Sequence, residues 1–113
     1  MGYYERLVYV ARNFLEYENY GSNKAKAVKI ISRYFPEKTT GECAIDFDSV
    51  CEVYKNAIAF ARSNSAIYFE WRKTKERSPL DTLEKNFKES QKNVPVKTID
   101  HILGWVYDWH LER

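Results

Sequence analysis

The segment from Asp48 to Arg77 contains neither Gly nor Pro, and its apolar residues recur at the spacing of an α-helix. One apolar stripe runs through Val50, Tyr54 and Ala57, and the polar residues on the opposite face keep their phase to the end of the segment. The poor helix formers at 63–65 (Ser-Asn-Ser) mark the point at which a kink or break would occur. Because the polar stripe does not change phase there, we predict one continuous helix over 48–77.

Helical periodicity also appears on both sides of this segment. Residues 3–18 carry a wide apolar face, which predicts a helix that ends near Gly21, where glycine can adopt the left-handed conformation after the last turn. Ser22 or Asn23 is expected to cap a second helix, which continues to about Tyr34 and ends before Pro36. Residues 37–46 lack periodicity and predict a loop of ten residues.

A polar residue is predicted to cap each of the three later helices. Asp46 or Asp48 is expected to cap the long helix, because a carboxylate accepts the free amide protons and favours the helix dipole. Ser78 is expected to cap a helix that begins at Pro79, and Thr98 is expected to cap the last helix.

The helix from Pro79 has a thin inward stripe, Leu80, Leu83 and Phe87, and a surface pair between Glu84 and Lys88. These patterns together predict an all-α fold: a single domain over residues 1–113, arranged as an irregular antiparallel bundle of about five helices with one long central helix.

Bulk composition limits the class of protein. With 113 residues, 44 % hydrophobic and 30 % charged, the chain suits one ordinary globular domain. No apolar run reaches the roughly 18 residues of a membrane span, and no signal sequence is evident. Cys43 and Cys51 are therefore interpreted as reduced thiols, and a cytoplasmic location without membrane contact is expected.

Few residues are suited to catalysis or metal binding. His101 and His110 are nine positions apart, about 180° of helix rotation, so one helix cannot direct both at the same metal. Sequence motifs of zinc proteases, phosphate-binding loops and serine hydrolases are missing. We therefore predict no cofactor, no metal and no enzymatic activity, and the only acid–base grouping worth testing is Asp100, His101 and Asp108.

The last helix has a polar and aromatic face that suits a protein partner. Aromatic residues make up 16 % of the chain, and exposed Trp and Tyr beside charges are the usual composition of binding hot spots. Burial of the same aromatic residues in the core is the alternative. The candidate partner-binding residues are Trp105, Tyr107, Asp108 and His101, together with the N-terminal Tyr3 and Tyr4.

Nucleic-acid binding is the alternative function. The net charge is only +2, but basic residues cluster in the second helix and near residue 75. These clusters are equally compatible with ordinary solvated surface. The candidate phosphate-binding residues are Lys24, Lys26, Lys29 and Arg33 in the first cluster and Arg72, Lys73, Lys75 and Arg77 in the second.

The function favoured by these observations is that of a small, soluble, non-catalytic protein-binding domain. Immunity proteins and inhibitors, which act by covering a partner protein, belong to this class, and the analogy carries no residue with it. The partner is expected to be a protein, and the chain itself is expected to be a monomer or a homodimer.

Overall fold

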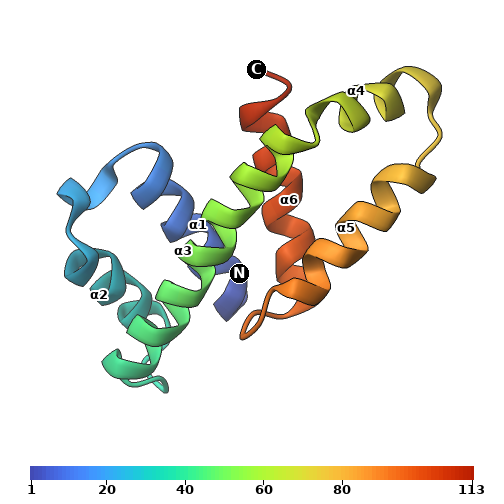
Figure 1. Ribbon diagram of the computed structural model, residues 1–113. Helices are drawn as coiled ribbons and strands as arrows, with labels where there is room; N and C mark the ends of the chain where they lie inside the picture. The colour runs from blue at the N-terminus through green and yellow to red at the C-terminus, as the bar shows by residue number, and fades with distance from the viewer. The chain divides into compact units, whose positions relative to one another are not determined.

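The computed structural model describes residues 1–20 and 22–113 in full, and of Gly21 only its place in a short helix. The described chain is all-α, with six α-helices, one short 3-10 helix and no strand (Figure 1). The elements are α1 (Tyr3–Glu16), η1 (Asn19–Ser22), α2 (Lys24–Tyr34), α3 (Thr40–Ser63), α4 (Ser65–Thr74), α5 (Ser78–Ser90) and α6 (Val96–His110). The predicted all-α class is confirmed, with six α-helices in place of about five.

The extra helix arises at Asn64, where the predicted continuous helix over 48–77 is divided into α3 and α4. Asn64 has φ −117° and ψ 21°, outside the helical range. Its side-chain Nδ2 donates to the Phe60 carbonyl at 2.9 Å, and its backbone N–H donates to the same oxygen at 3.0 Å. A local side-chain hydrogen bond of this kind competes with helical geometry, which accounts for the break. The prediction of one continuous helix was therefore wrong.

The start of α3 also differs from the prediction. Residues 40–46, which were expected to lie in a loop, form the first turns of this helix. Thr39 Oγ1 accepts from the Glu42 N–H at 3.0 Å, and Glu42 Oε1 accepts from the Thr39 N–H at 3.2 Å. This reciprocal pair is a capping box, so neither Asp46 nor Asp48 is needed as a cap.

The caps of the other helices match the predictions in part. Of the two predicted candidates, Ser22 and Asn23, it is Asn23 that caps α2, because its side chain accepts from the Lys26 N–H. The helix α5 begins at Ser78, one residue earlier than predicted, and its N-cap residue Arg77 makes no capping side-chain hydrogen bond. The helix α6 begins at Val96, so Thr98 lies inside its first turn and is buried. The predicted left-handed conformation of Gly21 falls outside the fully described residues.

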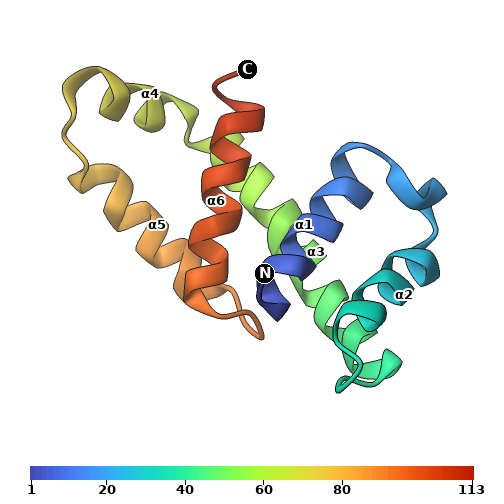
Figure 2. The ribbon, with the colours of Figure 1, turned by 180° about the vertical axis from the view of Figure 1, so that it is seen from behind.

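The chain divides within α3 into two compact units, residues 1–54 and residues 55–113. In unit 1, α1 packs against α2, and the buried residues include Leu7, Ile31 and Phe47. In unit 2, α5 and α6 run in roughly opposite directions, close together where α5 ends and α6 begins and further apart at their other ends (Figures 1 and 2), with Leu80 and Ile102 buried. The organisation of residues 1–113 as one domain stays a prediction.

Candidate functional site

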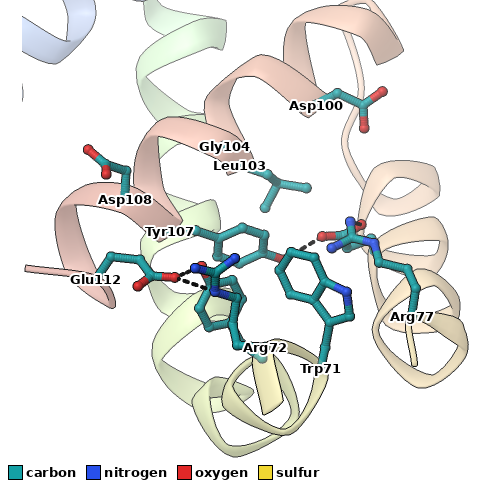
Figure 3. Close-up of a pocket in the computed structure, with 11 residues that line it drawn as sticks. Trp71, Arg72, Arg77, Asp100, Leu103, Gly104, Tyr107, Asp108 and Glu112 are labelled. Carbon is teal, nitrogen blue, oxygen red and sulfur yellow. Dashed lines mark hydrogen bonds and ion pairs between the residues drawn. The ribbon is translucent and has the colours of Figure 1, made fainter. Parts of the chain in front are cut away.

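Unit 2 contains a hollow of about 640 Å³ between α4, α5 and α6 (Figure 3). Its lining combines aromatic rings, two guanidinium groups and several carboxylates. The lining residues are Tyr68, Trp71, Arg72, Arg77, Glu84, Asp100, Leu103, Gly104, Tyr107, Asp108 and Glu112.

Three aromatic rings form one wall of the hollow. Tyr68 and Trp71 are three positions apart on α4, which places both on the same side of that helix, and their ring centroids are 5.5 Å apart. The ring of Tyr107, from α6, lies 4.7 Å from that of Tyr68. Tyr68 and Tyr107 are buried, whereas Trp71 is half-buried. The two tyrosines therefore support the more exposed tryptophan.

A buried carboxylate lies beside this wall. Glu84 is only 6 % exposed, yet both of its carboxylate oxygens accept hydrogen bonds. Arg77 Nη2 donates to Oε1 at 2.7 Å, and the Tyr107 hydroxyl donates to Oε2 at 2.6 Å. A buried charge is tolerable only when it is paired in this way. The predicted surface pair between Glu84 and Lys88 is not formed, because Lys88 pairs with Asp100 at 2.7 Å.

Arg77 links this carboxylate to the aromatic wall. Its guanidinium lies 4.5 Å from the centroid of the Trp71 ring, within the range of a cation–π contact. The same guanidinium pairs with Asp81 at 2.9 Å, one helical turn before Glu84. These contacts hold Trp71 and Arg77 together at the edge of the hollow.

A second ion pair lies at the other side of the aromatic wall. Arg72 Nε lies 3.0 Å from Glu112 Oε1, and the Tyr68 hydroxyl donates to the same oxygen. Burial, and then the hydrogen bond to Glu112, raise the pKa of Tyr68 to about 12. Burial and the hydrogen bond to Glu84 likewise raise the pKa of Tyr107. Both tyrosines therefore stay neutral hydrogen-bond donors at neutral pH.

Gly104 opens one side of the hollow. It lies inside α6, where glycine costs about 0.5–1 kcal/mol relative to alanine. A Cβ atom built at this position would meet no atom within 4 Å, so packing within the chain does not require glycine here. The carboxylates of Asp100 and Asp108 point away from the rings (Figure 3). The α6 backbone at Gly104 is thus accessible to a group that enters the hollow.

Of the four predicted partner-binding residues on α6, two line the hollow and two do not. Tyr107 and Asp108 line the hollow, but Tyr107 is buried and Asp108 pairs with Arg113 at 3.1 Å. His101 and Trp105 are half-buried, do not line the hollow, and contact each other with ring centroids 4.9 Å apart. The four residues therefore do not all belong to this hollow.

The predicted contacts Tyr3 and Tyr4 belong to unit 1. The Tyr3 hydroxyl donates to Asp46 Oδ2 at 2.7 Å, and its ring makes edge contacts with Tyr4 and Phe35. Burial, and then the hydrogen bond to Asp46, raise the pKa of Tyr3. Asp46 is thus a hydrogen-bond acceptor inside α3, and Tyr3 has a structural partner within its own unit.

The two basic clusters have different surroundings. In the cluster at 72–77, Arg72 and Arg77 are engaged by carboxylates of the hollow, while Lys73 and Lys75 are exposed. In the α2 cluster, Lys24 pairs with Asp48 at 2.6 Å. The remaining members, Lys26, Lys29 and Arg33, line a second hollow in unit 1.

Sequence reasoning missed Trp71, Glu84 and Gly104 as site residues. A signal for Glu84 was present: it follows Leu80 by four positions and precedes Phe87 by three, which places it on the inward face of α5. A carboxylate on an inward face needs a cation or a donor beside it. No comparable signal marks Trp71, because the hollow beside it is completed by side chains from α5 and α6.

The described residues lack a metal cluster: His, Cys, Asp and Glu side chains nowhere gather in threes close enough to bind an ion. Every helix in the described part of the chain is too short or too polar to span a bilayer. Comparison of the chain with known protein families, with curated proteins and with solved structures finds no match.

Proposed function

We propose that this chain is a non-catalytic protein-binding domain, and that the hollow between α4, α5 and α6 receives a side chain of the partner protein. The observation that carries the proposal is the composition of the hollow. Trp, Tyr and Arg are the residue types that dominate binding hot spots, and five of them surround this one space. They are Tyr68, Trp71, Arg72, Arg77 and Tyr107.

The hollow is also held in place before any partner arrives. Trp71 is fixed by the guanidinium of Arg77, which is fixed in turn by Glu84. Preorganised side chains lose little conformational entropy on binding, so more of the contact energy appears as affinity. The open backbone at Gly104 gives an entering side chain room against α6.

The exposed ion pair between Arg72 and Glu112 supplies specificity in this proposal. Arg72 is 49 % exposed and Glu112 is 32 % exposed, so both can turn from each other to charges on a partner. In this proposal the chain acts by covering a surface of its partner, as immunity proteins and inhibitors do. It acts in the cytoplasm, as a monomer or a homodimer. The His101–Trp105 pair is an additional contact in this proposal, outside the hollow.

Affinity capture tests the proposal. The tagged chain is incubated with a lysate of the native cell, and the retained protein is identified by mass spectrometry, purified and titrated by calorimetry. We expect Trp71→Ala and Arg72→Ala to weaken binding by about 2 kcal/mol, or roughly 30-fold, as hot-spot residues do. Lys85→Ala and Lys97→Ala, exposed positions on α5 and α6 outside the lining, are the matched controls.

Gly104→Ala separates lost binding from lost folding. Alanine should stabilise α6 by about 0.5–1 kcal/mol, while its methyl group enters the hollow and weakens the partner complex. If Trp71→Ala and Gly104→Ala bind the purified partner as tightly as the controls, the hollow is not the contact. A specifically bound protein should be released when an excess of untagged chain is added. If the tagged wild-type chain retains no such protein, protein binding itself is refuted.

A further inference from the structure

The exposed face of α2 in unit 1 carries a second hollow, of about 290 Å³. It is lined by Tyr20, Lys26, Lys29, Ile30 and Arg33. The three cations are spaced at i, i+3 and i+7, so one side of the helix presents all of them. No carboxylate is among the described lining residues.

These cations differ from most of the other basic groups that the clusters contain. Lys26, Lys29 and Arg33 are exposed, and none of the ion pairs found among the described residues includes them. Like charges one turn apart on a helix repel each other. An anion seated in the hollow would be attracted by all three cations, and this attraction would offset their mutual repulsion.

Aromatic rings accompany the cations. Tyr20 lines the hollow, and Tyr34, next to Arg33 in sequence, is 57 % exposed. The guanidinium of Arg6 lies 3.8 Å from the centroid of the Tyr34 ring. An exposed ring beside cations is the arrangement on which unpaired bases stack.

We propose that this face of α2 binds single-stranded nucleic acid, with backbone phosphates on Lys26, Lys29 and Arg33 and a base stacked on Tyr34. A hollow of this size is at or below the roughly 300 Å³ lower limit of small-molecule pockets, so it accommodates a phosphate group better than a whole nucleotide. A phosphorylated protein would use the cations alone, whereas a nucleic acid also uses the exposed ring. The inference is independent of the protein-binding hollow, which lies in unit 2.

The test is fluorescence anisotropy with labelled oligouridylate and oligodeoxythymidylate of about 12 nucleotides, within the usual site size of single-strand binders. Three neutralised phosphates predict that the logarithm of the binding constant falls against log salt with a slope of roughly −2. The double variant Lys26→Gln/Lys29→Gln should flatten this slope to roughly −0.7, because one phosphate contact remains. Lys55→Gln/Lys97→Gln, two exposed lysines of unit 2, removes the same charge and should keep the wild-type slope.

Tyr34→Ala tests the stacking step separately. Loss of one base–aromatic stack should weaken binding by about fivefold or more, and the salt slope should stay unchanged. All the substituted residues are exposed, and circular dichroism checks that each variant keeps its helical content.

Three outcomes would overturn the proposal. The first is the absence of an anisotropy change with either oligonucleotide at low salt. The second is an equal loss of slope in the α2 variant and in the unit 2 control, which would mean that only net charge matters. The third is binding of a phosphopeptide or heparin with no binding of the oligonucleotides, which would assign the hollow to another polyanion.

Discussion

Glu84 is the residue on which the walls of the candidate site most depend. Its carboxylate receives hydrogen bonds from Arg77 and Tyr107, and it is almost fully buried. Removal of Glu84 would leave the buried Tyr107 hydroxyl without its acceptor and would leave the half-buried Arg77 paired with Asp81 alone, which costs more than the pair itself contributes.

We therefore expect Glu84→Ala to lower the free energy of unfolding by about 1–3 kcal/mol in urea titrations. Glu84→Gln should cost less, because the amide oxygen still accepts from the Tyr107 hydroxyl. Glu89→Ala, at an exposed position of the same helix, should stay within about 0.5 kcal/mol of wild type. A loss for Glu84→Ala no larger than that for Glu89→Ala would contradict the assigned role.

The hydroxyl of Tyr68 gives the site a defined response to alkaline pH. Its pKa is raised from 10.0 to about 12 in the folded chain, first by burial and then by the hydrogen bond to Glu112. A raised folded-state pKa means that the stabilisation is complete below pH 10 and is lost as pH rises toward 12, because the unfolded chain releases this proton first.

The urea concentration at the midpoint of unfolding should therefore decrease as pH is raised from about 10 to about 12. The decrease should be smaller for Tyr68→Phe than for wild type. Tyr9→Phe, at an exposed position, should follow wild type. Burial also raises the pKa values of Tyr54 and Tyr107, so the difference between the variants is the measurement. Parallel curves for wild type and Tyr68→Phe would disprove the coupling.

At the scale of helices, the sequence predicts existence better than boundaries. Helix α2 was found with its cap because Asn23 stands directly before an uninterrupted apolar stripe. The start of α3 was missed because residues 37–46 lack periodicity, although Thr39 and Glu42 have the spacing of a capping box. Asn64 was recognised as a weak point, but periodicity records only the direction of each side chain and not the hydrogen bond that breaks the helix.

The capping box of α3 yields a measurable prediction. Thr39→Ala removes the oxygen that accepts from the Glu42 N–H, so the free energy of unfolding should fall by about 1 kcal/mol. Thr40→Ala changes the neighbouring exposed threonine, which lies inside the helix, and should alter stability by less than about 0.5 kcal/mol. Equal effects of the two substitutions in urea titrations would show that Thr39 contributes no cap.

At the scale of the whole molecule, the candidate site could not be predicted without the three-dimensional structure. Its hollow takes side chains from three helices, and the Glu84–Tyr107 hydrogen bond joins residues 23 positions apart. Periodicity assigns each residue to a face of its own helix, yet it does not say which other helix that face meets. Tyr107 was therefore expected at a surface and Glu84 in a surface pair. Both are instead buried, because α5 and α6 bring them together.

The two units are predicted to unfold together. Helix α3 continues through the boundary between Tyr54 and Lys55, and its buried residues belong to both units, Phe47 to unit 1 and Ala61 to unit 2. Units of 54 and 59 residues bury small cores, so neither is expected to be stable once the shared helix has unfolded.

The distribution of tryptophan makes this cooperativity measurable. All three, Trp71, Trp105 and Trp109, lie in unit 2, so tryptophan fluorescence reports on unit 2 while far-ultraviolet circular dichroism reports on the helices of both units. The two urea transitions should coincide.

Ile31→Val, in the core of unit 1, should cost about 0.5–1.5 kcal/mol and lower the fluorescence midpoint although no tryptophan lies in that unit. Ile45→Val, at an exposed position of unit 1, should leave the midpoint unchanged. A fluorescence midpoint that does not respond to Ile31→Val, while circular dichroism shows an earlier transition, would establish two independent domains.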